Sequence, residues 1–371
     1  MKKICILTSV HPRYDTRIFI KQARSLVRAG YDVTLLVADG FGCEKKDDIH
    51  IIDVGIGSMG RMSRMTRIVL LLYRKALSID ASIYHFHDPE LITAGLLLKA
   101  QRKRVIYDVH EDYQKAILSR NYLNPSLRKI TSDLFAIYER FGAKFFTGVV
   151  PATHAIAKRF ESLNRNVVVV QNFPIQDDPA DTEVPWKTRS DTVAYVGAIS
   201  VLRGVKEMVN AVGLASEGID VTLALAGNFS PQSLKKEIEY LDGWKHTQYL
   251  GYLPHENVTQ LLCGIKAGLV LFHPEPNHIF SQPNKLFEYM SAGIPVIASH
   301  FPYWRRIIEG SRCGICVDPL NTQEIAVAIR WILEHPEEAE LMGKNGRREV
   351  QERYNWSVEE NKFLSFYEKL L

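Results

Sequence analysis

The sequence predicts an α/β protein made of two doubly wound, Rossmann-like domains that face each other across a cleft. The chain has 371 residues, which is more than one hydrophobic core usually serves. In both halves, short apolar segments alternate with segments of helical spacing, a pattern typical of βαβ units around a parallel sheet. The halves are separated by residues 172–191, which contain three prolines and a cluster of acids.

The domain boundaries follow from that break. We predict an N-terminal domain at residues 1–172, a linker at 173–190 and a C-terminal domain at 191–355. The last segment, residues 356–371, has the sequence "WSVEENKFLSFYEKLL". It is long enough for a helix that packs back on the N-terminal domain.

The strands of each domain are predicted from continuous apolar segments, which are typical of sheets covered on both faces. In the first half they are "KICILTS", "YDVTLLVA", "SIYHFH", "RVIYDV" and "FTGVVPA". In the second half they are "TVAYVGAI", "DVTLALAG", "TQYLGYL", "AGLVLFH" and "IPVIAS". Between the first two strands, "RIFIKQARSLVRAG" has apolar residues at helical spacing and ends at Gly30, a typical helix terminator.

Charge is distributed unevenly along the chain, although the net formal charge is only +4. Residues 1–175 contain 27 Lys and Arg against 16 Asp and Glu, a formal charge of +11, whereas the remainder carries −7. This asymmetry indicates that the first half faces something anionic: a membrane surface, a nucleic acid or a phosphorylated substrate. The longest apolar run, residues 68–73, is too short to span a bilayer.

The segment "GRMSRMTRIVLLLYRKAL", residues 60–77, is a candidate for the anionic contact. It places five basic residues on one arc of a helix and five apolar residues on another. The basic residues are Arg61, Arg64, Arg67, Arg74 and Lys75, and the apolar residues are Met62, Met65, Val69, Leu72 and Tyr73. Two interpretations stay open: a core helix with a solvated basic face, or a helix that lies on an anionic membrane.

The beginning of the chain and its cysteines indicate a cytoplasmic protein. The segment "MKKICILTSV" lacks a small-residue cleavage site and predicts a strand rather than a signal peptide. Five cysteines, an odd number, suit a reducing compartment. Cys313 and Cys316 have the spacing of a redox motif or half a zinc site, but there is no second pair, so we interpret them as part of a buried strand.

The loop after the first strand lies at the edge of the sheet where doubly wound domains bind ligands. This loop, "SVHPRYDTR", contains no glycine, which argues against a nicotinamide or flavin enzyme. Asp15 and Arg17 stand at the start of the following helix. Either Asp15 caps that helix and Arg17 is solvated, or the two residues contact a substrate.

Histidines and acids gather after two other strands, in "YHFHDPE" and "YDVHEDY". Strand alternation places His85 and His87 on one face of the sheet, opposite the phenylalanine between them. Such clusters suit a metal ion or hydrogen bonds to a polar substrate, and we favour the substrate. The structural alternative is that Asp88 or Asp112 caps the following helix. His110 directly follows an apolar strand and is a candidate functional residue.

Two glycine-containing turns in the second half are candidates for nucleotide binding. The first, "YVGAISVLRGVKEMVNAV", places Gly197 at a strand end and Arg203 and Gly204 at a helix start, with Lys206 one turn further on. A helix N-terminus attracts anions, and a guanidinium can bind two phosphate oxygens, although a solvated helix start is the alternative. The second turn, "LGYLPHENV", is suited to holding a flat base.

Glu288 lies in "SQPNKLFEYMSAGIPVIAS", near the beginning of a helix that runs into a buried strand. Pro283 and Asn284 can start this helix, whose free N–H groups would face a phosphate. Glu288 would then accept hydrogen bonds from vicinal hydroxyls, such as those of a ribose. The alternative is a favourable interaction between an acid and the helix dipole.

Taken together, these segments resemble the retaining glycosyltransferases of family 4 (glycosyl transferases group 1), which have the GT-B fold. The segment "KLFEYMSAGIPVIAS" resembles the family's E-A-M-A-x-G-x-P-V-I motif, and "YVGAISVLRGV" is similar to its G-R-L-x-x-x-K-G phosphate segment. The opening "HPRYDTRIFIKQARSLVRAGYDVTLL" resembles its first βαβ unit. The resemblance covers essentially the whole chain, and its specificity comes from the order and spacing of the three segments.

The resemblance implies the transfer of a sugar, with retention, from a nucleotide-diphosphate sugar to a hydroxyl. The acceptor would be lipid-linked or a saccharide, in the synthesis of a bacterial cell-surface glycan such as O-antigen (lipopolysaccharide), capsule or exopolysaccharide. The N-terminal domain would bind the acceptor and the C-terminal domain the donor. The family requires neither a metal nor a cofactor, no D-x-D motif occurs here, and no nucleic acid is expected. The protein would be cytoplasmic, peripheral on the cytoplasmic face of the inner membrane.

Residue by residue, Glu288 matches the glutamate that holds the nucleotide ribose, Arg203 the lysine that neutralises the diphosphate, and His110 the histidine near the transferred sugar. The catalytic candidates are His110, Arg203 and Lys285. The candidates for binding the donor nucleotide are Gly197, Arg203, Gly251, Tyr252, Leu253, Asn284, Lys285, Leu286 and Glu288. The candidates for binding the acceptor are Asp15, Arg17, His87, Asp88 and Glu111.

Two positions depart from the family's pattern. Phe280 stands where the first glutamate of its E-x7-E motif would fall, and Ala198 stands where an arginine follows the strand-end glycine. The "P-N-K" loop resembles a variant of the segment in which Lys285 would supply the second positive charge. Glu275 is a less favoured replacement for the missing carboxylate.

Two other functions stay open on the sequence. A sugar-nucleotide epimerase of similar fold would use carboxylates such as Glu111 and Asp112 as acid and base. A membrane-associated scaffold that has lost turnover would explain the departures at Phe280 and Ala198.

Overall fold

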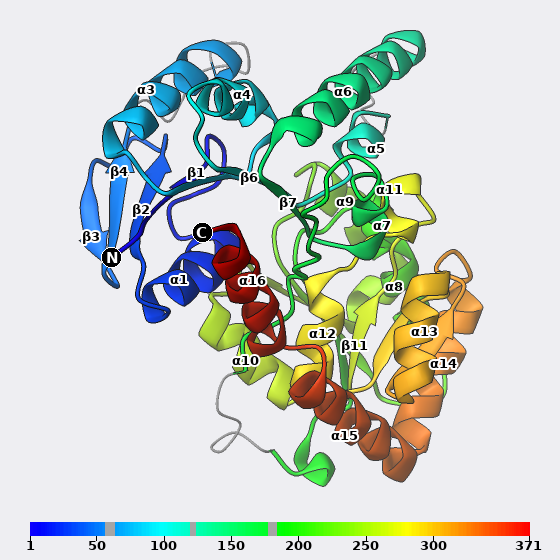
Figure 1. Ribbon diagram of the computed structural model, residues 1–371. Coiled ribbons are helices and arrows are strands. Elements are labelled where there is room, and N and C mark those ends of the chain that lie inside the picture. The colour runs from blue at the N-terminus through cyan, green and yellow to red at the C-terminus, as the bar shows by residue number, and fades with distance from the viewer. Residues whose placement is uncertain (56–63, 119–123, 177–183) are drawn as a thin grey trace. The chain divides into compact units, whose positions relative to one another are not determined.

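The computed structural model describes residues 1–55, 64–118, 124–176 and 184–371 (Figure 1). The chain divides into two compact units. The first contains Met1–Asn172 and Trp356–Leu371, and the second contains Phe173–Asn355. Each unit is an α/β sheet covered by helices, mostly parallel in the first unit and parallel in the second, as the continuous apolar segments predict.

The first unit has the strand order β3-β4-β2-β1-β5-β6-β7, with β3 antiparallel to β4 and the other neighbours parallel. Its strands are β1 (Lys3–Leu7), β2 (Asp32–Val37), β3 (Glu44–Lys46), β4 (Ile49–Asp53), β5 (Ile83–Phe86), β6 (Val105–Val109) and β7 (Gly148–Pro151). Its helices are η1 (Thr16–Ala23), α1 (Arg24–Arg28), η2 (Arg64–Ile68), α3 (Val69–Ile79), η3 (Pro89–Leu91), α4 (Ile92–Ala100), α5 (Tyr113–Leu118), α6 (Pro125–Phe145), α7 (His154–Ala157) and α16 (Trp356–Leu370).

The second unit has the strand order β10-β9-β8-β11-β12-β13, and all of these neighbours are parallel. Its strands are β8 (Thr192–Val196), β9 (Thr222–Ala226), β10 (Thr247–Gly251), β11 (Ala267–Val270), β12 (Val296–Ser299) and β13 (Gly314–Val317). Its helices are η5 (Trp186–Thr188), η6 (Val201–Arg203), α8 (Val205–Ala215), α9 (Leu234–Glu239), η7 (Asp242–His246), α10 (His255–Cys263), α11 (Pro276–Ile279), α12 (Asn284–Ser291), α13 (Pro302–Ser311), α14 (Thr322–Glu334) and α15 (Pro336–Glu352).

All ten predicted strands are present, and the described residues contain three more. β3 and β4 lie in "CEKKDDIHIID", where frequent charges hide the strand pattern. β13 contains Cys316, which is half-buried, and Cys313 just before the strand is fully buried, so the pair lies at a strand as expected, but that strand is only partly buried.

The end of the chain belongs to the first unit. Trp356, Phe363 and Tyr367 of α16 are buried in the same hydrophobic cluster as β1 and β2. Phe173, by contrast, packs edge-on against Phe287 with ring centroids 4.8 Å apart, and Trp186 is buried in the same core. Those parts of the expected linker at 173–190 therefore belong to the second unit, while residues 177–183 lie outside the described residues.

The helix expected at residues 60–77 is described from residue 64 onward, as η2 and α3, without the side chains of Arg64 and Met65. Val69 and Leu72 are buried in the core, whereas Arg67, Arg74 and Lys75 are exposed. The described part of this segment is thus a helix that packs on the core and has an exposed basic face. Among the described helices, none combines the length and apolar character that crossing a bilayer requires.

Candidate functional site

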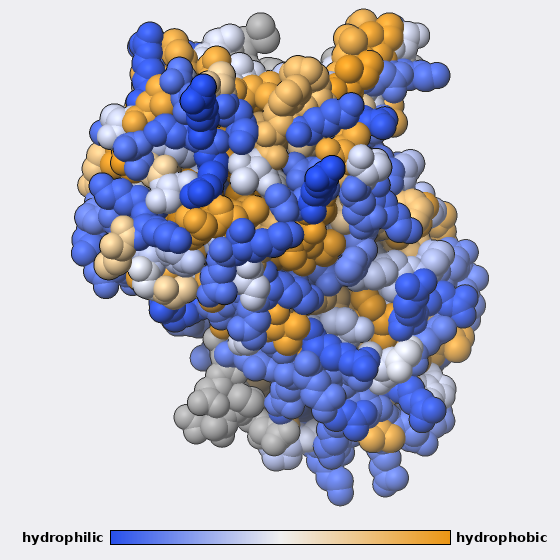
Figure 2. All heavy atoms as spheres, in the orientation of Figure 1, coloured by the Kyte–Doolittle hydropathy of each residue, from blue (hydrophilic) through white to orange (hydrophobic). Residues whose placement is uncertain are grey.

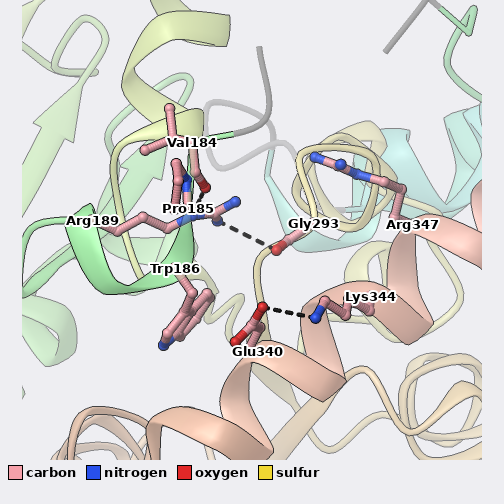
Figure 3. Close-up of a pocket in the computed structure, with 8 residues that line it drawn as sticks. All are labelled: Val184, Pro185, Trp186, Arg189, Gly293, Glu340, Lys344 and Arg347. Atoms are coloured by element: carbon pink, nitrogen blue, oxygen red, sulfur yellow. Dashed lines mark hydrogen bonds and ion pairs between the residues drawn. The ribbon is translucent and has the colours of Figure 1, made fainter. Parts of the chain in front are cut away.

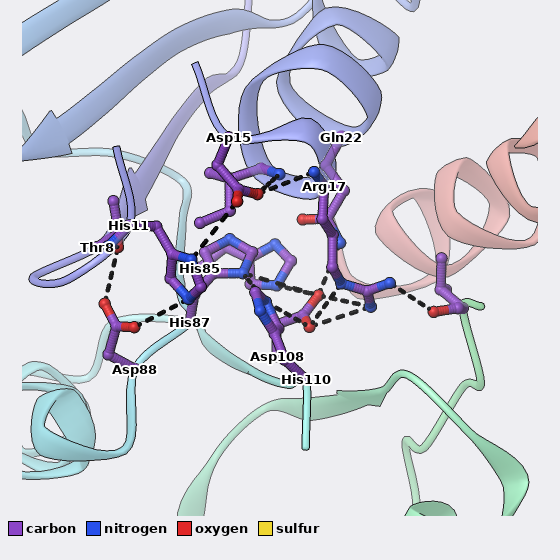
Figure 4. Close-up of polar contacts among 12 residues, drawn as sticks. Thr8, His11, Asp15, Arg17, Gln22, His85, His87, Asp88, Asp108 and His110 are labelled. Carbon is purple, nitrogen blue, oxygen red and sulfur yellow. Dashed lines mark hydrogen bonds and ion pairs between the residues drawn. The ribbon is translucent and has the colours of Figure 1, made fainter. Parts of the chain in front are cut away.

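The carboxyl-end edge of the first sheet holds a buried polar cluster centred on Asp108 of β6 (Figure 4). Its carboxylate accepts hydrogen bonds from Arg17 Nε at 3.1 Å and Gln22 Nε2 at 2.7 Å. The Nε2 atoms of His85 and His110 lie 3.4 and 3.2 Å from its oxygens. Burial alone would raise the pKa of Asp108, but Arg17 and the histidines outweigh it and hold that pKa well below its usual range. The carboxylate is therefore ionised and compensated inside the fold.

The Arg17 side chain is buried and makes its hydrogen bonds within the protein. Its guanidinium also donates to the carbonyl oxygen of Val170 at 2.8 Å, and the residue is 4% exposed. Asp15 caps η1 by accepting hydrogen bonds from the backbone N–H groups of Arg17 and Ile18, so the capping interpretation is confirmed. The expectation of a solvated or substrate-bound Arg17 is corrected to a positioning role, because its donors already have partners.

Asp88 ties down the loop that follows β1. It is 1% exposed and accepts hydrogen bonds from the Thr8 hydroxyl at 2.8 Å and the Ser9 N–H at 2.6 Å, and His11 Nε2 lies 3.3 Å away. It makes no side-chain cap to η3, which corrects the capping alternative. Asp112, in contrast, accepts a hydrogen bond from the N–H of Lys115 at the start of α5.

Four histidines extend the cluster toward solvent. His85 and His87 stack with ring centroids 4.7 Å apart, and both are fully buried, which lowers their pKa values. His87 Nδ1 lies 2.8 Å from His110 Nε2, and His110 contacts the ring of His11 at 5.0 Å. Because ionised Asp108 only accepts, His110 Nε2 carries a hydrogen and leaves Nδ1 as an acceptor in the neutral ring. The His110 side chain is 13% exposed, so of this histidine group His110 and His11 can meet a ligand directly, and Glu111 beside them is exposed.

The ring nitrogens of His85 and His87 and an oxygen of Asp108 lie within 4.8 Å of one another, close enough to hold a metal ion. However, Arg17 Nη2 lies 3.0 Å from the same carboxylate. A divalent cation here would stand beside a fixed positive charge in a buried environment, where repulsion is strong. The arrangement therefore fits a compensated polar network better than a metal site.

The carboxyl-end edge of the second sheet holds a buried lysine instead. Lys285, in the first turn of α12, is 8% exposed. Its ammonium lies over the rings of Tyr195 at 4.8 Å and Phe272 at 5.2 Å, and no ion pair or hydrogen bond to it is found among the described residues. Burial, and then the charge of Arg203, lowers its pKa to about 7, although Glu288 acts in the opposite direction.

Arg203 lies beside this lysine at the end of η6. Its guanidinium carbon is 4.8 Å from the centroid of the Phe272 ring, so one aromatic side chain contacts both cations. Two like charges in a desolvated place repel each other unless an anion joins them. An anionic ligand would relieve the repulsion between Lys285 and Arg203.

Two glycines make room for the cations and the loop that carries them. A Cβ on Gly197, whose φ is +132°, would lie 3.0 Å from Lys285 Nζ. A Cβ on Gly204, whose φ is +77°, would lie 2.1 Å from the carbonyl oxygen of Leu271. Only glycine permits both the backbone conformation and the close approach. The loop after β8 is therefore built to come close to the start of α12.

The other donor candidates surround this pair in different ways. Glu288 and Asn284 are exposed on α12, whereas Leu286 is fully buried and its N–H already donates to the Pro283 carbonyl. The structure thus corrects Leu286 from a contact residue to a core residue. Pro283 is the cap of α12 and Asn284 is its first residue. The helix therefore begins one position earlier than it would if Asn284 were the cap.

Gly251, at the end of β10, adopts a φ of +65° and is followed by exposed Tyr252 and half-buried Leu253. This is the expected turn ahead of α10. Phe280, in place of the family's first glutamate, is 52% exposed, and the backbone oxygen of Ala198 accepts a hydrogen bond from Tyr195 at 2.7 Å. Neither position contributes a charge to the site.

The aromatic platform of Tyr195 and Phe272 was missed by the sequence analysis. Tyr195 lies in β8 and Phe272 just after β11, where both appear as ordinary strand residues. Their signal is positional, because each stands within two residues of the carboxyl end of a strand that flanks the predicted phosphate loop. Asp108 was likewise visible as a charge inside the apolar segment "RVIYDV", which implied a buried partner.

A separate pocket of about 280 Å³ lies in the second unit, at the amino ends of β8 and β12 (Figure 3). Trp186, Arg189, Gly293 and Arg347 line it. Arg189 donates to the Gly293 carbonyl and Arg347 to that of Ala292, so both guanidiniums brace the turn that follows α12. Gly197 lies at the carboxyl end of β8, so this pocket at the amino end of the strand is separate from the site of Lys285 and Arg203.

Comparison with known proteins gives the family. Residues 16–173 match the family model described as Glycosyltransferase Family 4, and residues 177–349 match the model described as Glycosyl transferases group 1. The two matches cover most of the chain in the order of its two units. This chain belongs to the glycosyl transferases group 1 family, and its fold is GT-B.

Individual relatives are distant. The MMP alpha-(1->4)-mannosyltransferase of Mycolicibacterium hassiacum is 25% identical over 187 residues, 50% of this chain and 44% of that protein. An uncharacterized glycosyltransferase of Methanocaldococcus jannaschii is 23% identical over 260 residues, 67% and 62% of the two chains. The matched region thus spans about half the length of these curated relatives.

Solved structures share the fold along the whole chain. Sucrose-phosphate synthase from Thermosynechococcus elongatus has a TM-score of 0.77 at 19% identity, covering 100% of this chain and 99% of its own. HepE of Anabaena, in complex with UDP and glucose, has a TM-score of 0.73 at 15% identity, covering 100% of both chains.

Proposed function

We propose that this protein is a retaining glycosyltransferase that moves a sugar from a nucleotide-diphosphate sugar to a hydroxyl acceptor. Family membership supports the reaction class, and the solved neighbours that hold UDP or UDP-glucose support a uridine nucleotide as the first donor to test. The reaction needs neither a metal nor a cofactor in this proposal, because the chain supplies positive charge from its own side chains.

The observation that carries the proposal is the cation pair of Lys285 and Arg203, neither of which makes an ion pair among the described residues. A diphosphate brings the negative charge that this pair lacks. The free N–H groups at the start of α12 add partial positive charge toward the same anion. Lys285 thereby takes over the charge that Ala198 cannot provide.

The chemistry follows from the same electrostatics. The bond between the anomeric carbon and the diphosphate oxygen breaks, and the electron pair leaves with the diphosphate. Lys285 and Arg203 stabilise that leaving group as its charge grows. The acceptor oxygen forms the new bond on the face that the diphosphate vacates, and its proton passes to the departing phosphate oxygen, so the configuration is retained.

We assign the acceptor and the transferred sugar to the carboxyl-end edge of the first sheet. Asp108 and His87 both lie against Nε2 of His110, which leaves Nδ1 to bind a sugar hydroxyl. Arg17 and Asp88 hold the surrounding loops in place. The proposed acceptor is a lipid-linked or saccharide intermediate of a bacterial cell-surface glycan, reached from the cytoplasmic side of the membrane.

The experiment is a donor screen followed by transfer. Thermal shift with nucleoside-diphosphate sugars should select a donor, since a ligand at about 100 times its Kd stabilises a protein by about 2.7 kcal/mol. The radiolabelled donor is then incubated with a bacterial lipid extract. Label in the lipid phase supports the transferase, conversion of the donor without acceptor indicates an epimerase, and binding without either indicates a scaffold.

The role of the cation pair has its own test. Arg203→Ala and Lys285→Ala should reduce kcat more than donor affinity, because their contribution grows toward the transition state. Lys206→Ala is the matched control, since Lys206 also lies at the start of α8 but is exposed and paired with Glu237 at 3.0 Å. Normal kcat in both variants would contradict the leaving-group role.

A further inference from the structure

Helix α6 carries an exposed apolar stripe along its outer side. Six large apolar side chains recur at spacings of three and four residues, and each is 52–66% exposed. They are Leu127, Ile130, Leu134, Ile137, Phe141 and Phe145. In Figure 2 the projecting end of α6, at the upper right, shows this apolar surface beside hydrophilic residues. Contiguous exposed apolar surface of this kind marks an interaction site in soluble domains.

The opposite side of α6 is fixed on the first unit, so the helix cannot turn the stripe inward. Glu139 is fully buried, pairs with Arg159 at 2.5 Å and accepts a hydrogen bond from Tyr107 at 2.9 Å. A Cβ on Gly142 would lie 2.9 Å from Ile92 of α4, which shows how closely this side packs. Turning the stripe inward would break the pair of Glu139 with Arg159 and open the contact between Gly142 and Ile92, so the packing of α6 keeps the stripe on the outer side.

Basic residues flank the stripe. Lys129, Arg140 and Lys144 are exposed and make no ion pair among the described residues, and Asp133 is the one exposed acid in the described part of this helix. The half of the chain that contains α6 carries the +11 excess. An apolar stripe bordered by cations is the pattern of a helix that lies in the surface of an anionic bilayer.

We propose that α6 is a membrane-docking helix whose apolar stripe enters the interface of an anionic bilayer while its cations contact lipid headgroups. A second copy of the chain fits less well, because pairing two such stripes would bring Lys129, Arg140 and Lys144 close to their own equivalents. The inference adds the docking element to the proposed function, but it does not depend on transfer activity.

The test is flotation of the full chain with vesicles of phosphatidylcholine alone and of phosphatidylcholine and phosphatidylglycerol at about 7:3. Wild type should float with the anionic vesicles at low salt and less at high salt. Leu134→Gln/Ile137→Gln should weaken binding by about 100-fold, roughly tenfold for each side chain removed from the bilayer. Arg140→Gln/Lys144→Gln should weaken it by about tenfold or more.

The matched control for the apolar pair is Val327→Gln/Leu341→Gln in the second unit, where the two side chains are 51% and 57% exposed. It should bind like wild type, and circular dichroism should show all variants folded, since the changed side chains are exposed. Absence of wild-type flotation, or equal flotation of the α6 variant and its control, would overturn the proposal. So would a wild-type dimer in size-exclusion chromatography that Leu134→Gln/Ile137→Gln converts to a monomer. Because no transfer is measured, failure here leaves the proposed reaction untouched, and failure to transfer sugar leaves docking untouched.

Discussion

Both sheets have charged side chains at the carboxyl ends of their strands, but the charges have different partners in the two units. At the carboxyl-end edge of the first sheet, Asp108 is surrounded by Arg17, Gln22 and histidines, and its charge is compensated. At the same edge of the second sheet, Lys285 and Arg203 share an aromatic platform, and neither makes an ion pair among the described residues. Lys285 is buried like Asp108, so the burial of a charged side chain alone does not distinguish a structural role from a functional one.

The two clusters should contribute to the free energy of unfolding in different ways. A compensated buried charge stabilises the fold only while its partners stay in place, and removing one leaves the others uncompensated. A buried cation without an ion-pair partner lowers the free energy of unfolding of the ligand-free protein, and the binding of an anion offsets that loss. The two clusters should therefore respond oppositely when a charged side chain is replaced by a neutral one.

Asp108→Ala should give the largest loss of stability. It removes the anion that Arg17 faces at 3.0 Å in a buried site, and breaking such a pair costs about 3–5 kcal/mol. Urea denaturation measures the free energy of unfolding. Asp133→Ala, an exposed acid of the same unit, is the control and should change it by less than about 0.5 kcal/mol. Equal small losses in both variants would mean that the Asp108 cluster does not hold the fold together.

Lys285→Met should behave in the opposite way. Methionine keeps the buried stem and removes the charge, so the free energy of unfolding without ligand should stay the same or rise by about 1 kcal/mol. Affinity for UDP should fall by about 100-fold, since a hydrogen bond to a charged group contributes about 1.5–3 kcal/mol. Calorimetric titration and urea denaturation measure the two quantities. A variant that loses stability and keeps its UDP affinity would reverse the comparison.

The sequence predicts the sheets better than it predicts these two clusters. Continuous apolar segments such as "KICILTS" and "IPVIAS" are typical of strands buried on both faces, so their alternation with helical segments predicts the fold. Lys285 and Arg203 are 82 positions apart in the numbering, and only the fold shows that both lie against Phe272. The partner of Asp108, Arg17, is 91 residues away, so the sequence offered only a solvated or a substrate-bound arginine there.

The two basic helices of the first unit illustrate the same limit. Both α3 and α6 combine basic residues with an apolar arc, and the sequence analysis singled out only the segment that contains α3. The structure buries Val69 and Leu72 of α3 but exposes Leu134 and Ile137 of α6. In α6, small residues such as Ala143 and the paired Glu139 form the inner side, so the larger apolar side chains face outward. Periodicity reveals two faces of a helix, but it does not reveal which of them the core will choose.

The pH dependence of stability should also separate the clusters. The pKa of Lys285 is lowered to about 7, whereas lysine in an unfolded chain has a pKa of about 10.4. Between these values the unfolded state binds more protons, so the free energy of unfolding without ligand should rise with pH, by about 2 kcal/mol between about pH 7 and about pH 9. The cost of the buried charge is fully present below pH 7 and absent once the pH exceeds the unfolded pKa.

The measurement is urea denaturation across that pH range for wild type and Lys285→Met, since subtracting the two curves removes every other titrating group. Parallel curves would show that Lys285 is not the titrating group. UDP affinity should fall over the same range in wild type, because the neutral amine no longer attracts the diphosphate. Calorimetry in two buffers of different ionisation enthalpy should then reveal proton uptake on binding.

The smallest predicted effect concerns Glu288, an exposed acid of α12 that lies three residues after Lys285. If Glu288 accepts hydrogen bonds from the ribose hydroxyls, Glu288→Ala should weaken UDP binding by about tenfold, the lower end for a hydrogen bond to a charged group. Glu256→Ala, which removes an exposed acid from the first turn of α10 in the same unit, is the control and should bind UDP normally. A second ligand identifies the contact: 2′,3′-dideoxyuridine diphosphate lacks both hydroxyls, so it should bind wild type and Glu288→Ala equally. An effect of Glu288→Ala that is the same for both ligands would show that Glu288 acts on the diphosphate through Lys285, whose pKa it raises, rather than on the ribose.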